Sequence, residues 1–389
     1  METPDIWITG LGVVSAAGEN TEQTLRTFNG SQSPPQPRPF EDSSLECPVF
    51  HAPLTPTGQR RSRTADLAFH ALDEALESAG HPERDSRARL GICVGTTVAC
   101  QLNDLEFYRD YRETSCPSLD PVCRFLKSNL AEALADSIGA GGPRSTIVNA
   151  CSSGADAIGM AASWLASDLC DVVIAGGADE LNRVPLCGFH SLGIVSDAPC
   201  RPFDRDRDGL NLGEGAGLVV LESEASARRR KRPKELLLSG FGAACDAHHI
   251  TAPHPEGIGL NLALERAVEV AGLNPDDLAF VNAHGTATPD NDRVEGCALA
   301  DAFGEDVPVL STKGYTGHTL GAAGGIEAVF AALGLRDGRI PPSAGFSNPD
   351  PDIPVRPVQD RLSVDGTSAV STSLAFGGNN SAIVIRRDA

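Results

Sequence analysis

The segment IVNACSSGADAIG occupies residues 147–159 and changes character at its single cysteine, Cys151. The apolar run that begins at Ile147 predicts a short strand, and the small residues after the cysteine predict a helix that continues to Leu165. A cysteine where a strand turns into a helix lies at the positive end of the helix dipole, which favours the thiolate over the thiol. The segment therefore predicts an α/β protein in which Cys151 is a nucleophile.

Outward from this segment, strand-like and helix-like stretches alternate along the chain. Continuous apolar runs, such as residues 171–177 and 278–283, are typical of strands in a sheet that is covered on both faces. Alternation of this kind predicts a layered α/β fold.

The alternation runs through two similar rounds. Each round contains a strand that breaks into a helix rich in Ala and Gly, at residues 151 and 318. Each round also ends with a Gly-rich loop before an apolar strand, at 213–221 and 377–385. We therefore expect an internal duplication. Its N-terminal half, residues 1–235, would carry the nucleophile, and its C-terminal half, residues 236–389, would carry two histidines.

The composition narrows the class of protein. A formal net charge of −20 argues against nucleic-acid binding, which needs a basic face. The eleven cysteines are scattered without metal-binding spacing, so we expect no metal site and a reducing, cytoplasmic location. No apolar run approaches the length of a membrane span, and the N-terminus lacks the pattern of a secretion signal.

Three glycine-punctuated motifs in the second half carry further candidate groups. His284 opens the motif HGTATPDND directly after an apolar strand, where α/β proteins place ligands. Lys313 and His318 share the motif STKGYTGHTLGAAG at residues 311–324. The loop AFGGNN at residues 375–380 is suited to bring a backbone amide near the sulfur.

Each histidine taken alone is more often hydrogen-bonded structure than catalyst, and we interpret His248, His249 and His254 in that way. By contrast, His284 and His318 follow strands in similar turns, as Cys151 does. We therefore treat this pair and the cysteine as one candidate site.

Two basic clusters stand out on the acidic chain. Arg60, Arg61 and Arg63 precede a predicted helix and form either a solvated helix start or a docking point for an acidic carrier. For the run RRRKRPK at residues 228–234, a solvated turn between a helix and a strand is the favoured interpretation.

Together these motifs resemble those of β-ketoacyl-acyl-carrier-protein synthases, over nearly the whole chain from TGLGVVS at 9–15 to AFGGN at 375–379. The segments RPFDRDRDG at 201–209 and TAPHP at 251–255 are similar to the synthase II branch, although Ala375 replaces a glycine that is usual there. The resemblance implies a five-layered α/β/α/β/α fold of the thiolase type with internal duplication.

The resemblance also implies a role for each group in a decarboxylative Claisen condensation. Cys151 would carry the acyl chain as a thioester, and His284 and His318 would hold the malonyl thioester and stabilise its enolate. The amides of Cys151 and Phe376 would form the oxyanion hole, and Phe376 would also gate the acyl chain.

Supporting roles are implied for a further set of residues. Lys313 would pair with Glu327, which needs the turn between them to fold back because they lie 14 positions apart. Thr286 and Thr288 would bind pantetheine, and Asp292 and Glu295 would be supporting acids that hold water or an ion.

The implied partner is an acyl carrier protein, whose phosphopantetheine delivers the substrates, so no other cofactor is expected. The chain would form a homodimer, or a heterodimer with a chain-length-factor-like subunit in a specialised polyene or polyketide pathway. Two other classes remain open: a Cys-His thioester hydrolase and a non-catalytic scaffold. The retained Cys151, His284 and His318 fit the scaffold poorly.

Overall fold

The structure is a computed structural model that describes residues 5–30, 35–36, 45–55, 62–97, 105–120, 122–123 and 129–388. The strands of its main sheet are β1 (Ile6–Ser15), β2 (Leu90–Gly95), β3 (Arg144–Ile147), β4 (Val172–Asp179), β5 (Gly215–Ser223), β6 (Leu236–Cys245), β7 (Leu278–Asn282), β8 (Val309–Leu310), β11 (Ser368–Ala375) and β12 (Asn379–Arg387). A small second sheet pairs β9 (Arg339–Ile340) with β10 (Leu362–Ser363).

The helices connect and cover these strands. They are α1 (Thr21–Phe28), α2 (Arg63–Ser78), α3 (Leu105–Thr114), α5 (Leu130–Ile138), α6 (Ser153–Ala166), α7 (Arg183–Ser191), α8 (Glu224–Arg229), α9 (Ile258–Ala271), α10 (Pro289–Phe303), α11 (Lys313–Thr316) and α12 (Ala323–Asp337), with short 3₁₀ turns η1 (Pro82–Arg84), η3 (Pro275–Asp277) and η4 (Leu320–Ala322). None of these described helices combines the length and the apolarity needed to cross a bilayer.

In the described part of the chain, ten strands form one sheet in the order β3-β2-β4-β5-β1-β6-β12-β11-β7-β8. From the centre outwards, the five N-terminal strands follow the chain order first, fifth, fourth, second, third, and the five C-terminal strands repeat it. Both halves also repeat the same sequence of antiparallel and parallel pairs. The expected internal duplication is therefore confirmed.

The two halves of the sheet meet where β1 pairs with β6, at Ile6 with Leu238 and Trp7 with Leu237. The predicted division between residues 235 and 236 falls immediately before β6. As a boundary between separate domains, that division stays a prediction.

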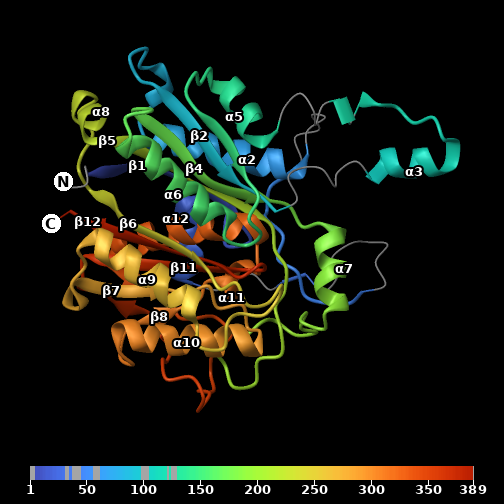
Figure 1. The fold of residues 1–389 in the computed structure, drawn as a ribbon, viewed down its shortest axis with the longest axis vertical. Helices are drawn as coiled ribbons and strands as arrows, with labels where there is room; N and C mark the ends of the chain where they lie inside the picture. Colours follow the sequence, from blue (N-terminus) through green and yellow to red (C-terminus); the bar gives the residue numbers. More distant parts are fainter. Residues whose placement is uncertain are drawn as a thin grey trace.

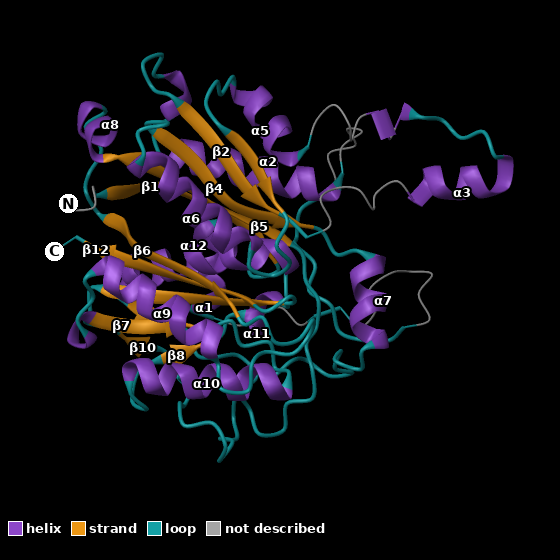
Figure 2. Ribbon diagram, in the orientation of Figure 1, coloured by secondary structure: helices purple, strands orange, loops and turns teal. Residues whose placement is uncertain are grey.

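Helices α6 and α12 occupy equivalent places in the two halves and pack between the two parts of the sheet (Figure 1). On the outer faces, α2 covers β1, β5 and β4, and α9 covers β6 and β12. This arrangement gives the five expected layers, whereas α3 projects away from them (Figure 2).

The two central helices approach closely because small residues face each other. A Cβ atom on Gly154 of α6 would lie 2.7 Å from the backbone nitrogen of Gly325 in α12. Every residue of α12 from Ala323 to Leu335 is buried, as its nearly continuous apolar sequence predicts. The segments that lead into α6 and α12 therefore place their side chains in the middle of the molecule.

Candidate active site

The nucleophile candidate lies in the turn between β3 and α6. The strand predicted to start at Ile147 instead ends there, because the chain must turn before the helix. Ala150 adopts a left-handed conformation with φ of 48°, which is uncommon for a residue with a side chain. The turn places Cys151 two residues before the start of α6, and its side chain is buried.

Burial raises the pKa of the Cys151 thiol to about 12, although the charge of Lys313 and a hydrogen bond from the Phe376 amide act in the opposite direction. The expectation of a resting thiolate is therefore wrong for this conformation. The helix N-terminus is evident from the sequence, but the desolvation of a cysteine residue that is only 5% exposed is not. The resting group is a thiol, which must lose its proton as it attacks.

His318 follows α11 and is fixed by the start of the next turn. Its Nδ1 accepts a hydrogen bond from the Leu320 amide at 3.1 Å. Burial and the charge of Lys313 hold the pKa of His318 well below its usual value, so the ring is neutral. A neutral ring that accepts at Nδ1 carries its proton on Nε2, which is then a donor.

His284 lies two residues after the end of β7. Its imidazole ring is neutral, like that of His318. Lys313 Nζ lies 3.1 Å from His284 Nδ1, and an ammonium group can only donate there. Burial, followed by the charge of Lys313, holds the pKa of His284 well below its usual value. The two imidazole rings lie edge to face, with centroids 5.1 Å apart. Each ring therefore has an Nε2–H donor and no positive charge.

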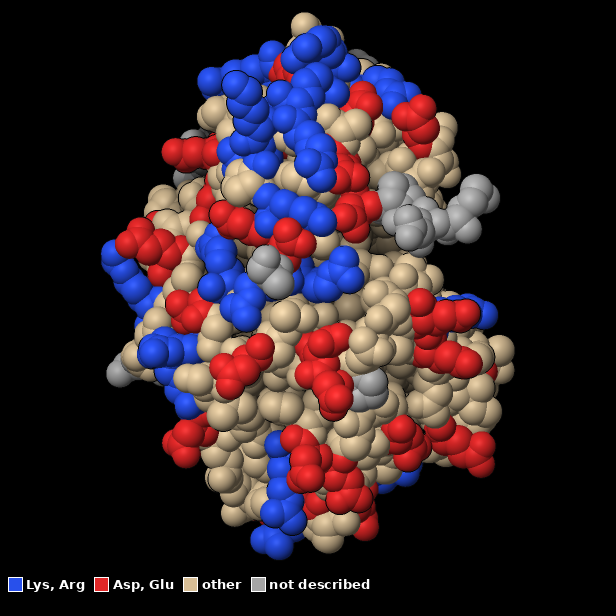
Figure 3. Space-filling model, turned by 90° about the vertical axis from the view of Figure 1, so that its left-hand side faces the viewer, with Lys and Arg blue, Asp and Glu red and all other residues tan. Residues whose placement is uncertain are grey.

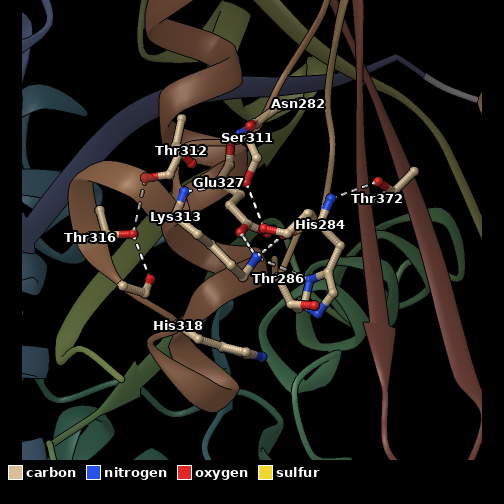
Figure 4. Close-up of polar contacts among 12 residues, drawn as sticks. Asn282, His284, Thr286, Ser311, Thr312, Lys313, Thr316, His318, Glu327 and Thr372 are labelled. Atoms are coloured by element: carbon tan, nitrogen blue, oxygen red, sulfur yellow. Dashed lines mark hydrogen bonds and ion pairs between the residues drawn. The ribbon is translucent and has the colours of Figure 1, made fainter. Parts of the chain in front are cut away.

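Lys313 is itself held by a buried acid, as Figure 4 shows. Its ammonium group donates to Glu327 Oε1 and to the carbonyl oxygen of His284, and both charged side chains are buried. Burial raises the pKa of Glu327, and the neighbouring Lys313 offsets part of this shift. The chain does fold back between α11 and α12, so the expected Lys313–Glu327 pair is present.

The loop that carries His284 is anchored by the two acids of α10. Glu295 accepts from the amides of His284 and Gly285, at 2.7 and 2.8 Å. Asp292 accepts from the amides of Thr286 and Phe203. These carboxylates accept hydrogen bonds from backbone amides, and their expected role in holding water or an ion stays a prediction. The sequence places both acids in the helix after the loop, but it does not indicate which groups they bind.

A pocket of about 420 Å³ opens onto the candidate groups. Its lining includes the candidate cysteine, both candidate histidines and a mixture of polar and apolar residues: Cys151, Phe189, Leu192, Gly193, Ile194, Asp208, Leu210, Asp246, Thr251, Ala252, Pro253, His284, Thr286, Thr288, Pro289, Asp290, Asn291, His318, Leu374, Ala375, Phe376 and Asn380. The hydroxyl groups of Thr286 and Thr288 lie 2.8 Å apart in this wall. Among the described residues, no group of three or more His, Cys, Asp or Glu is placed to hold a metal ion.

Phe376 lies in the turn between β11 and β12, and its ring packs against Phe189 of α7 with centroids 5.4 Å apart. Gly377 and Gly378 follow with φ of 87° and 79°, conformations that favour glycine. Phe189 is not among the residues that the sequence motifs predict at the site. The only sequence signal was an aromatic residue in a short amphipathic helix, which says nothing about the loop that it meets.

The structure describes only part of the first basic cluster, Arg60, Arg61 and Arg63. Arg60 and Arg61 lie outside the described residues. Arg63 donates to Glu214 at 2.8 Å and to the carbonyl oxygens of Leu54 and Ala52, so its guanidinium group is committed to internal contacts.

The run at 228–234 lies on the face that Figure 3 shows, where Lys and Arg gather on the upper part. Several of its members pair with acids of the same chain: Arg228 with Glu224, Arg229 with Asp85, and Lys234 with Asp5 and Asp388. These ion pairs agree with the favoured interpretation of a surface turn.

Comparison with known proteins places the chain in a family. The model of the β-ketoacyl synthase N-terminal domain matches residues 50–227, and that of the C-terminal domain matches residues 237–347. The chain belongs to the β-ketoacyl synthase family. It is similar to 3-oxoacyl-[acyl-carrier-protein] synthase 2 of Staphylococcus aureus strain N315, with 34% identity over 85% of this chain and 83% of the relative. The synthase 2 of Synechocystis is 32% identical over 100% of this chain and 99% of its own length.

Solved structures of this synthase family share the fold over the full length. The ishigamide ketosynthase/chain length factor superposes with a TM-score of 0.90 and 28% identity, covering 100% of both chains. A ketosynthase in complex with its chain length factor from Xenorhabdus doucetiae gives 0.83 and 29%, covering 99% of this chain and 98% of that one. The thiolase-like α/β fold is thus shown, and the chain is a condensing acyltransferase.

Proposed function

We propose that this synthase joins an acyl group on Cys151 to a malonyl unit delivered by an acyl carrier protein. The observation that carries the proposal is the pair of neutral imidazoles whose Nε2–H donors share one pocket with the sulfur. Two uncharged donors suit an enolate, because they stabilise negative charge without supplying the acid that would quench it.

In the first half-reaction, the Cys151 sulfur attacks the carbonyl carbon of the incoming acyl thioester. A new carbon–sulfur bond forms, and the pantetheine sulfur leaves with the proton that the cysteine gives up. The amides of Cys151 and Phe376 would bind the oxyanion that develops on the carbonyl oxygen. The Phe376 amide lies near enough to the sulfur to act against the raised pKa of Cys151, which supports this assignment.

In the second half-reaction, the malonyl carboxylate leaves as carbon dioxide, and its electron pair forms an enolate. His284 and His318 would donate to the enolate oxygen. The enolate carbon then attacks the acyl carbon on Cys151, and the cysteine sulfur leaves and takes up one proton to restore the thiol. The product is a β-ketoacyl thioester two carbons longer than the starting acyl group.

The supporting residues act through these groups. Lys313 and Glu327 would fix the tautomer and charge state of His284, and Asp292 and Glu295 would hold its loop. Thr286 and Thr288, which line the pocket, would donate to the amide carbonyls of the pantetheine arm. Phe376 would move aside to admit the acyl chain.

The test is product analysis with purified chain, acyl carrier and malonyl carrier. Condensation yields a β-ketoacyl product longer by two carbons, with release of one carbon dioxide for each product. A thioester hydrolase would instead release the free acid at the same rate with or without malonyl carrier, and that outcome would exclude our proposal. In the same assay, the variant Cys151→Ala should not be acylated.

A narrower candidate is the active subunit of a specialised ketosynthase pair. Two of the similar solved structures contain a ketosynthase with a chain length factor, which favours such a partner here. Co-expression with a ketosynthase-like subunit that lacks the cysteine would give a heterodimer with condensing activity. A homodimer that is fully active alone would support the general fatty-acid role instead. The cytoplasmic location stays a prediction in either case.

A further inference from the structure

Asp156, in the first turn of α6, connects two parts of the site that lie far apart in the sequence. Its Oδ2 accepts hydrogen bonds from Asn149 Nδ2 at 2.6 Å and from Ser152 Oγ at 2.8 Å. Its Oδ1 accepts a hydrogen bond from Ser381 Oγ. One carboxylate therefore holds the turn that carries the nucleophile and, at the same time, the strand β12.

The contact on β12 reaches the hairpin that carries Phe376. Ser381 pairs with Ser373 across the β11–β12 hairpin, and Phe376 lies in the turn between these strands. Helix α6 lies in the N-terminal half of the chain, whereas the hairpin is formed by two strands of the C-terminal half. The Asp156–Ser381 contact thus bridges the two halves beside the site.

The contacts on the other oxygen surround a strained backbone. Asn149 and Ser152 flank Ala150 and Cys151, and Ala150 has the left-handed φ of 48°. Such a conformation costs on the order of a kcal/mol and persists only where neighbouring contacts hold it. Further bonds, from the Asn149 amide to Ser153 Oγ and from Ser153 Oγ to the Ala150 carbonyl, close the turn. The Cys151 amide is therefore aimed by a network in which Asp156 accepts two bonds.

We propose that Asp156 is a positioning residue that sets the alignment of the two oxyanion-hole amides, those of Cys151 and Phe376. This inference rests on the proposed function. The two donors come from opposite halves of the fold, and both must point at one oxygen atom in the transition state. Asp156 acts through the turn and the hairpin, without contact to the reacting atoms.

Two reactions of the same sulfur separate alignment from simple reactivity. Transfer of an acyl group from an acyl-pantetheine thioester develops an oxyanion and needs both amides. Alkylation by iodoacetamide displaces iodide from a saturated carbon and develops no oxyanion. Both reactions can be followed at Cys151 by mass spectrometry of its peptide in the full-length protein.

We expect Asp156→Ala to slow acylation by about 10- to 100-fold, because small errors of orientation are costly in catalysis, and to leave alkylation within about threefold. Asp156→Asn should recover most of the rate, since its oxygen accepts from the turn and its amide donates to the Ser381 hydroxyl. Ser381→Ala should slow acylation, and combining it with Asp156→Ala should add little. Ser163→Ala is the matched control, because the hydroxyl of Ser163 bonds to the Gly159 carbonyl of the same helix.

The inference is overturned if Asp156→Ala is acylated at the wild-type rate, or if acylation and alkylation fall by the same factor. It is also overturned if Asp156→Asn is as slow as Asp156→Ala, because the charge would then matter instead of the bonding geometry. A wild-type protein that is alkylated but never acylated would remove the proposed function, and the inference with it.

Discussion

Lys313 Nζ lies 3.1 Å from Nδ1 of His284, and the same ammonium group donates to the His284 backbone carbonyl. The lysine thus fixes both the orientation and the tautomer of the imidazole. Its charge also lowers the pKa of His284 and of His318, after burial, which is the larger cause. Burial and one buried cation together therefore keep both proposed enolate donors neutral.

Replacing Lys313 tests this arrangement. In Lys313→Met, His284 loses the donor that fixes its tautomer, so condensation should fall by about 100-fold or more, the range seen when an electrostatic donor is lost. The variant should also lose about 3–5 kcal/mol of unfolding free energy, because Glu327 is left buried without its partner. Steady-state kinetics and urea unfolding measure the two effects.

The control for Lys313 is a variant that removes both charges. Lys313→Met with Glu327→Gln has no uncompensated buried carboxylate, so most of the stability should return. Condensation should stay low, because the imidazole is still without its donor. Full activity in this double variant would contradict the assigned role of the lysine.

The depressed pKa values of the two histidines predict how stability depends on pH. Unfolded histidines bind protons below about pH 6.5, whereas His284 and His318 stay neutral in the folded state. The unfolded state then carries more protons, so the stability they contribute is present above pH 6.5 and is lost as the pH falls. Each ring contributes up to about 1.4 kcal/mol per pH unit in that window.

Urea unfolding of the wild type and of His318→Gln between pH 7 and 5 isolates one ring. Asp292 has a pKa raised to about 6 by burial and favours the folded state at lower pH, but it is unchanged in both proteins. The slope should therefore be smaller in the variant by up to one proton. Equal slopes would mean that His318 is protonated in the folded protein.

The raised pKa of Cys151 predicts how its reactivity depends on pH. Because burial holds the pKa of the thiol at about 12, alkylation should rise about tenfold per pH unit between pH 7 and 9 without reaching a plateau. The rate must be read from the Cys151 peptide, because cysteines such as Cys116 and Cys187 are exposed. A plateau near pH 7 would show a thiolate formed by the helix dipole and Lys313.

Much of the fold was predictable because the decisive signals are local. The helices at Thr21–Phe28 and Leu130–Ile138 show their periodicity in the sequence, and the repeated Gly-rich loops indicated the duplication. The strand end at Ile147 was missed, since a turn with a left-handed alanine has no residue pattern of its own. What decides that turn is bonding to Asp156 and Ser153, which only the folded chain reveals.

For the site, the sequence indicated which residues meet but not how they bond. Cys151, His284 and His318 do line one pocket, as their shared turn context suggested. The protonation state of each group depends on burial and on partners that are distant in sequence, such as Lys313 for His284. Arg63 illustrates the same limit, because its membership of a basic cluster gave no sign of the carboxylate that binds it.

The cluster Arg60, Arg61 and Arg63 gives the last prediction, because the guanidinium group of Arg63 binds Glu214. Burial alone would raise the pKa of Glu214, but hydrogen bonds from His51 and Arg63 lower it. Arg63→Ala should therefore destabilise the fold by roughly 1–3 kcal/mol, because the buried carboxylate of Glu214 loses a charged donor. If Arg60 and Arg61 lie on the surface, as both interpretations of the cluster require, Arg60→Glu with Arg61→Glu should leave stability within about 0.5 kcal/mol.

If Arg60 and Arg61 form the docking point, the double Glu variant should affect carrier binding more than Arg63→Ala does. The double Glu variant should bind an acidic carrier more weakly than the wild type at low salt, and its affinity should change less as salt increases. Isothermal titration at two salt concentrations measures both effects. Carrier affinity that is unchanged in this variant would return the pair to a solvated helix start, which leaves the carrier to dock elsewhere around the pocket.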